Sequence, residues 1–188
     1  MDTILWNANA ECEVSVQLSQ QGAKGVDCAI SVKNLSDRDL YMFDRCYDQL
    51  TPEARPDYDK AVFYSWLDGG NRLILFKGID APPPDLNVES MVYPACTKIQ
   101  AFGRHEDHLT IALPVRLYAP YRSPGSQVQG ASPLVVFRFG YFLGHEATAS
   151  MEIKVPSKEG ELIAFDPFDH NFQKIIEVGP FQPLPIAQ

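Results

Sequence analysis

The chain has 188 residues, 45% hydrophobic and 21% charged, which is typical of one globular domain and argues against disorder. Acidic residues outnumber basic residues by 24 to 16, giving a formal net charge of −8. Nucleic-acid-binding proteins usually carry a basic patch, and anionic membranes attract basic segments. The negative net charge therefore argues against both nucleic acid and an anionic membrane as partners.

The N-terminal residues and the cysteines indicate a reducing compartment. The chain starts at Met1 without a basic region, and its first apolar run, residues 4–6, is too short for a signal peptide. No stretch approaches the roughly 18 apolar residues of a membrane helix. We therefore expect a cytoplasmic protein. The four cysteines contain no C-x-x-C pair. Cys12 and Cys28 fit buried strand positions. Cys46 and Cys96 lie at predicted strand ends, and the sequence allows them to be either free thiols or a disulfide.

Alternation of polar and apolar residues predicts the first strands. Residues 11–19 alternate strictly, as a strand with one buried face does, and residues 26–33 alternate as well. The glycine-containing loop between them predicts a hairpin. Residues 34–39 have the composition of a turn, because the side chains of Asn, Ser and Asp form hydrogen bonds with nearby backbone groups in turns. Thr51-Pro52 predicts one short helical turn, with Thr as N-cap and Pro at the first helical position.

The rest of the chain repeats the pattern of short strands and turns. Residues 109–117 alternate, and Pro114 among them indicates an edge strand or a bulge, because proline donates no ladder hydrogen bond. Residues 134–143 are apolar in both phases, which predicts a central strand covered on both faces. Further strands are expected at 40–43, 61–67, 72–76, 88–93, 98–102, 151–155, 161–165 and 174–178.

About ten short strands and almost no helix predict an all-β fold, a two-sheet antiparallel β-sandwich. Residues 1–188 are expected to form one domain, with 1–10 and 180–188 as irregular ends. The loops at 77–87 and 118–133 suit crossovers between sheets better than a barrel. The overall pattern is similar to immunoglobulin-like sandwiches, and residues 30–37 resemble the strand-then-turn opening that many of them share. That resemblance implies a fold and no function.

The densest polar cluster is Arg104-His105-Glu106-Asp107-His108. Imidazoles and carboxylates are ligands for divalent metals, so His105, Asp107 and His108 are candidate ligands. The spacing differs from H-E-x-x-H, and His105 and His108 would point to opposite sides of a strand. The competing interpretation is a solvated hairpin tip before the strand at 109.

Other polar groups suggest no chemistry beyond turns and surface contacts. Arg45 lies between Asp44 and Asp48, which predicts a local surface ion pair. Asp166 and Asp169 lie in a predicted turn. The glycine-rich nucleotide motifs and the G-x-S-x-G elbow are missing from the sequence. We therefore expect no cofactor and favour a non-enzymatic protein.

The loop from Tyr118 to Pro133 combines the residue types of interface hot spots. Tyr118, Tyr121 and Arg122 are the candidates for contact with a partner. Neighbouring prolines would lower the cost of ordering the loop. The leading hypothesis is a protein-binding domain that recognises a protein partner through its long loops. The alternative is a metal-binding domain or metal-dependent enzyme that uses the cluster at 105–108. A homodimer formed through edge strands is possible.

Overall fold

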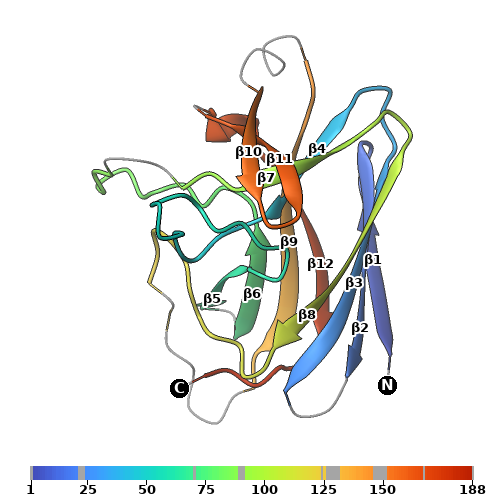
Figure 1. Cartoon of the computed structure of the whole chain (residues 1–188). Helices are drawn as coiled ribbons and strands as arrows, with labels where there is room; N and C mark the ends of the chain where they lie inside the picture. Colours follow the sequence, from blue (N-terminus) through green and yellow to red (C-terminus); the bar gives the residue numbers. More distant parts are fainter. Residues whose placement is uncertain are drawn as a thin grey trace.

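The computed structural model describes residues 2–20, 24–69, 71–88, 92–123, 125, 132–145, 152–166 and 168–187. They form an all-β sandwich of twelve strands in two sheets (Figure 1). The four-stranded sheet has the antiparallel order β1 (Thr3–Ala8), β2 (Cys12–Gln20), β3 (Gly25–Asn34) and β8 (Arg104–Ala112). The eight-stranded sheet has the order β10 (Glu152–Ser157), β11 (Gly160–Phe165), β7 (Ala95–Ile99), β4 (Leu40–Arg45), β9 (Leu134–Leu143), β6 (Arg72–Lys77) and β5 (Tyr64–Asp68), with β12 (Lys174–Phe181) also paired to β9.

Strand β9 is the centre of the eight-stranded sheet. It pairs with β12 from residue 135 to 141, with β6 from 134 to 139 and with β4 from 141 to 143. The pairing with β6 is parallel, so the sheet is mixed, whereas the sequence predicted antiparallel pairing throughout. Strand β9 is buried along most of its length, as its apolar residues in both phases predict.

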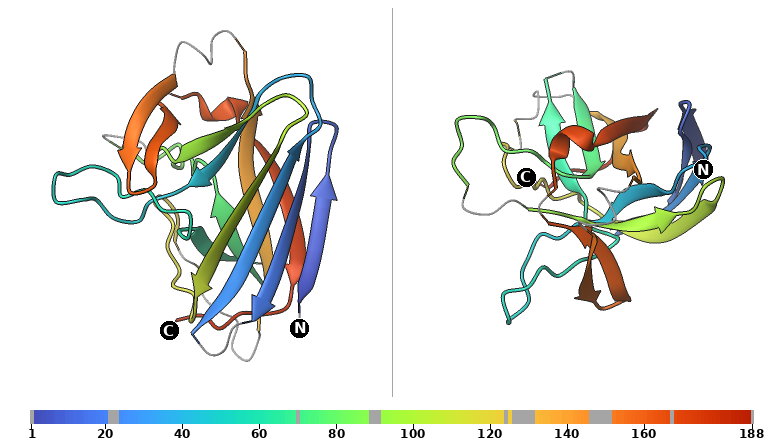
Figure 2. Two further views of the ribbon diagram at one scale, coloured as in Figure 1. Left: turned by 45° about the vertical axis from the view of Figure 1, so that its right-hand side comes forward. Right: turned by 90° about the horizontal axis from the view of Figure 1, so that it is seen from above.

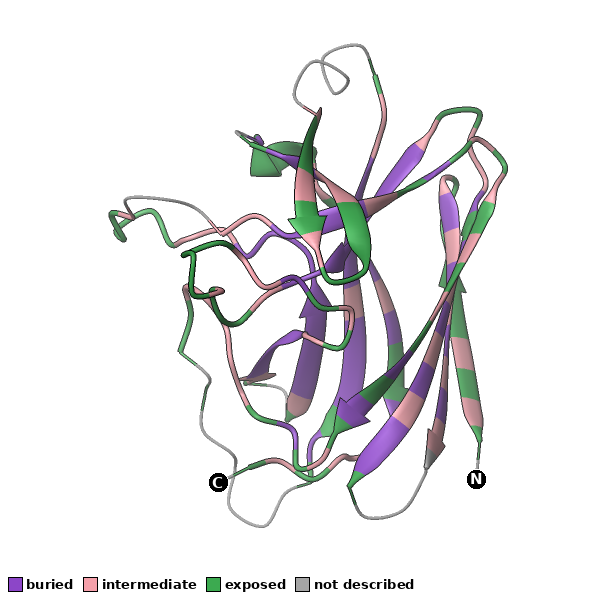
Figure 3. Cartoon of the chain, viewed as in Figure 1, coloured by how far each residue is buried: buried purple, intermediate pink, exposed green. Residues whose placement is uncertain are grey.

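The main core lies between the two sheets, which face each other in Figure 2. In the four-stranded sheet only alternate residues enter this core, so Figure 3 shows alternating bands along β2 and β3. The inward row of β2 consists of Cys12, Val14, Val16 and Leu18. It packs against Phe137, Phe139 and neighbouring side chains of the eight-stranded sheet. The period-two pattern therefore predicted the buried face of this sheet correctly.

The opposite face of the eight-stranded sheet carries further apolar clusters. One of them gathers Tyr41, Phe43, Phe142, Phe165 and Phe168, whose rings stack or meet edge to face. Rings at such angles gain about 0.5–1.5 kcal/mol per pair beyond area burial. These clusters explain why β4 and β9 are apolar in both phases.

Several local predictions differ from the structure. Thr51-Pro52 begins a turn and no helix, and the one helical turn of the described residues is the 3-10 helix His170–Phe172. The predicted irregular N-terminal end contains β1, whose exposed Ile4 and Trp6 hid the alternation. The cluster at 104–108 lies inside β8 and not at a hairpin tip; β8 ends at Ala112, before Pro114.

The four cysteines are free thiols, and all are buried. Cys46 and Cys96 are therefore not bridged. Burial raises the pKa of both thiols, which favours the unreactive protonated form.

Asn34 fixes the end of the sandwich where β3 leaves the four-stranded sheet. Its buried amide nitrogen lies 2.7 Å from the Arg38 carbonyl oxygen, 3.2 Å from that of Ile99 and 3.0 Å from that of Gln100. Its side-chain oxygen accepts hydrogen bonds from Ser36. One side chain thus joins the turn after β3 to the turn between β7 and β8.

Replacing Asn34 by Ala should lower the free energy of unfolding by about 2–4 kcal/mol, because buried carbonyl groups lose their donor. Urea denaturation measures the change. Asp37→Ala, at an exposed position of the same turn, should stay within about 0.5 kcal/mol of the unchanged protein. Equal effects of the two substitutions would contradict this role of Asn34.

Candidate functional site

A group of charged side chains lies between β8 of the four-stranded sheet and β4 of the eight-stranded sheet. We call it the inter-sheet charge cluster; its members are Asp44, Arg45, His105, Asp107 and Glu159. Arg45 is buried, and its Nη1 lies 2.6 Å from Oδ2 of Asp107 and 3.0 Å from Oδ2 of Asp44. Its Nε donates to Glu159 at 3.1 Å, in the turn between β10 and β11. The predicted surface pair of Asp44 and Arg45 is therefore buried, and the contact of Arg45 with Asp107 connects the two sheets.

Local backbone geometry brings the members of the cluster together. The pairing of β4 with β7 shifts register between Phe43 and Arg45, so two residues of β4 face one residue of β7. Such a bulge changes the direction of the side chains that follow it. On β8, His105 and Asp107 are two residues apart and share the inward face. Adjacent residues of β4 and alternate residues of β8 thus meet in one place.

Electrostatic interactions in the cluster shift the pKa values of two groups. Interaction with Asp107, and then with Asp44, raises the pKa of His105 to about 9, although burial opposes the charged imidazole. Burial alone would raise the pKa of Asp107, but His105 and Arg45 hold it well below its usual range. At neutral pH the cluster therefore contains an imidazolium ion facing carboxylates.

Asp44 has an unusual environment for a buried carboxylate. The residue is only 5% exposed, and neither of its carboxylate oxygens accepts a hydrogen bond from the described residues. Arg45 lies close enough for an ion pair, but its N–H groups do not point at these oxygens. Nε2 of His105 is 3.6 Å from Oδ2 of Asp44 and 3.7 Å from Oδ2 of Asp107, too far for a hydrogen bond.

Lys77 is a second buried charge beside the cluster, and it is fully paired. Its Nζ donates to the carbonyl oxygens of Asp44 at 2.8 Å, Lys60 at 2.6 Å and Val62 at 3.1 Å. An ammonium group has three donors, so each has an acceptor. Burial lowers the pKa of Lys77. The arrangement indicates a structural role in holding the segment before β5.

The structure brings together two of the three predicted metal ligands. Carboxylate or imidazole atoms of Asp44, His105 and Asp107 lie within 4.8 Å of one another and could hold a metal ion. His108 is on the outer face of β8 and is exposed. Sequence reasoning missed Asp44, although a charged pair directly after the apolar run 40–43 was a signal for buried charge.

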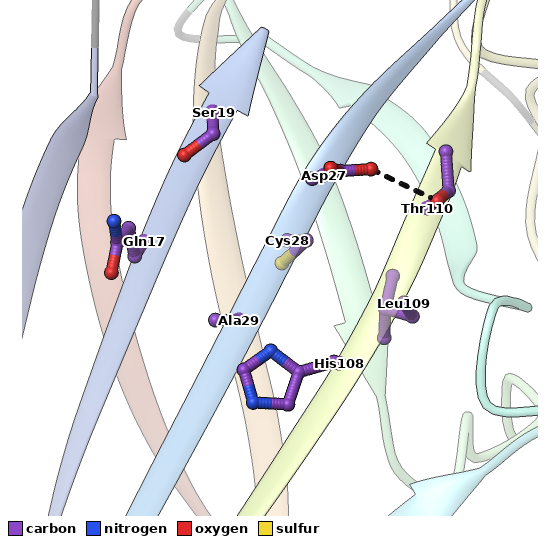
Figure 4. A pocket seen from close by; sticks show the side chains of 8 residues that line it. All are labelled: Gln17, Ser19, Asp27, Cys28, Ala29, His108, Leu109 and Thr110. Atoms are coloured by element: carbon purple, nitrogen blue, oxygen red, sulfur yellow. Dashed lines mark hydrogen bonds between the residues drawn. The ribbon is translucent and has the colours of Figure 1, made fainter. Parts of the chain in front are cut away.

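The outer face of the four-stranded sheet is hollowed and carries both polar and apolar side chains. A hollow of about 500 Å³ is lined by Gln17, Ser19, Asp27, Ala29, His108 and Thr110, together with Cys28 and Leu109 (Figure 4). Figure 4 shows the imidazole of His108 reaching from β8 toward Ala29 of β3, beside the hydrogen bond from Thr110 to Asp27. A second hollow of about 220 Å³ continues toward Ile4 on β1. Short side chains leave this face open to a ligand.

The predicted partner-binding residues pack against the protein itself. Arg122 binds the carboxylate of Asp80, which is 1% exposed, and its guanidinium lies 4.3 Å from the ring centroid of Trp66. The hydroxyl of Tyr121 accepts a hydrogen bond of 2.6 Å from the backbone of Val92. Tyr118 contacts Tyr64 edge to face, and its backbone pairs with Ser65 of β5. These contacts anchor the loop to the eight-stranded sheet.

Arg122→Ala should lower the free energy of unfolding by about 1–2 kcal/mol, because Asp80 loses the partner of its buried charge. The loss should shrink when Asp80 is also replaced by Asn, and a double-mutant cycle with urea denaturation measures this coupling. Arg116→Ala, at an exposed position of the same segment, is the control. A coupling close to zero would show that the contact does not stabilise the protein.

The pKa of His105 predicts how stability changes with pH. The folded-state pKa of about 9 is above the ordinary value of 6.5, so folding favours the protonated imidazole. Its contribution should be complete below pH 6.5 and lost as pH rises through 9. That contribution is on the order of 3 kcal/mol at most.

Urea denaturation in metal-free buffer across this pH range measures the effect. His105→Gln should lose less stability than the unchanged protein over this range, whereas His108→Gln should lose as much, because His108 does not belong to the cluster. The prediction fails if the two variants show the same decline as the unchanged protein.

Comparison with protein families, curated proteins and solved structures finds no match to this chain. The likeness to immunoglobulin-like domains therefore stays a prediction. No helix of the described residues is long and apolar enough to cross a membrane.

Proposed function

We propose that the protein is a non-enzymatic binding domain that holds a protein partner on the outer face of its four-stranded sheet. The observation that carries this proposal is the hollow between Gln17 and His108 beside an exposed tryptophan. Trp6 on β1 is 67% exposed and points to the same face as Ile4. Tryptophan is the residue type most enriched at interface hot spots.

The size and chemistry of this face suit a protein partner. Four strands, spaced by about 4.8 Å and each about nine residues long, give this sheet face a projected area of roughly 600 Å². A standard interface buries about 800 Å² on each partner. The face offers apolar side chains at β1 and polar side chains toward β8, and protein interfaces combine both kinds of contact. A partner would place apolar side chains against Trp6 and polar groups over Gln17 and His108.

The long-loop hypothesis receives less support from the contacts of its residues. Tyr121 and Arg122 are held by Val92 and Asp80, so using them for a partner would require these contacts to break. Part of that loop, at 124 and 126–131, lies outside the described residues. The loop therefore supports the scaffold, and the sheet face is the better candidate for recognition.

The proposal predicts which substitutions weaken binding. Affinity purification with the full chain as bait, followed by mass spectrometry, identifies partners. Trp6→Ala should weaken their binding by about 30-fold or more, the effect of a 2 kcal/mol hot spot. Gln17→Arg should weaken binding by placing a longer, charged side chain in the hollow. A photo-crosslinking residue at position 17 should join the partner covalently.

Phe102→Ala is the matched control, because Phe102 is 69% exposed but lies in the turn between β7 and β8. It should leave the partner list and affinities unchanged. A partner list that is identical for the unchanged protein, Trp6→Ala and Gln17→Arg would exclude the sheet face. Light scattering on the same preparation tests whether the chain forms a homodimer.

A further inference from the structure

We propose that the inter-sheet charge cluster binds one divalent cation of the zinc type through Asp44, His105 and Asp107. This site is separate from the proposed docking face, because these side chains point between the sheets whereas Gln17 and His108 point outward. The proposed cation site therefore does not depend on the proposed protein partner, and each can be tested without the other.

The spacing of the donor atoms fits a small cation. Nε2 of His105 is 3.6 Å from Oδ2 of Asp44 and 3.7 Å from Oδ2 of Asp107. Tetrahedral coordination with bonds of about 2.1 Å places neighbouring donors about 3.4 Å apart. One imidazole and two carboxylates are a donor set that zinc and related borderline metals accept. A fourth position would be left for water.

The state of Asp44 provides the second, independent argument. A buried carboxylate without hydrogen-bond donors is costly, and such groups usually pair or coordinate a metal. Nε2 of His105 is likewise buried without a hydrogen-bond partner among the described residues. Donor atoms of Asp44, His105 and Asp107 lie within 4.8 Å of one another, so one cation could accept a ligand atom from each residue.

Arg45 regulates access to this site. Its Nη1 lies between Asp44 and Asp107 and supplies the positive charge that the carboxylates need. A cation must displace Nη1, while Nε keeps its hydrogen bond to Glu159 at the outer rim. The side chain of His105 is 26% exposed, which provides the entry side. Binding therefore displaces the guanidinium nitrogen from the two carboxylates and releases the proton of His105 to solvent, because only a neutral imidazole can ligate a metal.

The test uses the full, untagged chain after removal of metals with a chelator. Titration with Co²⁺ should produce the visible absorption of a low-symmetry four-coordinate site, saturating at one equivalent, and Zn²⁺ should abolish it. Zn²⁺ should also raise the melting temperature, because it binds the folded site more tightly than the unfolded chain. Asp44→Asn and His105→Gln should weaken binding by more than about 100-fold, beyond the effect of typical outer-sphere partners.

His108→Gln is the matched control, since it removes an imidazole from the same strand but from the opposite face. It should leave the absorption and the stoichiometry unchanged. Circular dichroism of each variant separates loss of binding from loss of folding, and Asp107→Asn serves where Asp44→Asn does not fold. An absent cobalt spectrum, unchanged binding in folded His105→Gln, or loss of binding in His108→Gln would overturn the proposal.

Discussion

Burial of β9 on both faces is the constraint on which the rest of the structure depends. One face of this strand closes the core between the sheets through Phe137 and Phe139, and the other supports the aromatic cluster around Phe142. Because β9 also pairs with β4, β6 and β12, one strand fixes the position of three others. Close packing on both faces leaves little freedom to shift register.

The two edges of the four-stranded sheet reach the second sheet through different chemistry. At β1, the side-chain amide of Asn7 donates to the carbonyl oxygen of Glu177 on β12 at 2.8 Å. At β8, Arg45 and Asp107 form a buried ion pair. A buried pair stabilises little compared with apolar packing, yet breaking it leaves an uncompensated charge. The β8 edge is thus the part of the sandwich whose closure depends on charge and protonation.

The sequence predicted the fold class and most strands because one physical signal, alternation, governs a sheet with one buried face. That signal was strong in β2 and β3, and the unbroken apolar run of β9 was equally informative. It failed at β1, where Ile4 and Trp6 are exposed, so apolar residues occupy the outer phase. The parallel pairing of β6 with β9 depends on contacts distant in sequence, which no local pattern encodes.

Local sequence spacing predicted only part of the candidate site, the part that lies on β8. His105 and Asp107 share one face of a strand, and that relation follows from a spacing of two residues. The contribution of Asp44 depends on the bulge in β4 and on the placement of β4 opposite β8, neither of which the residues near 105 reveal. His108 belongs to the same polar sequence, but its odd spacing from His105 puts it on the outer face, beside Ala29 and Gln17. A single strand therefore carries two chemically separate surfaces. A substitution in one row of β8 can change the buried cluster without changing the outer face, and the reverse holds for the other row.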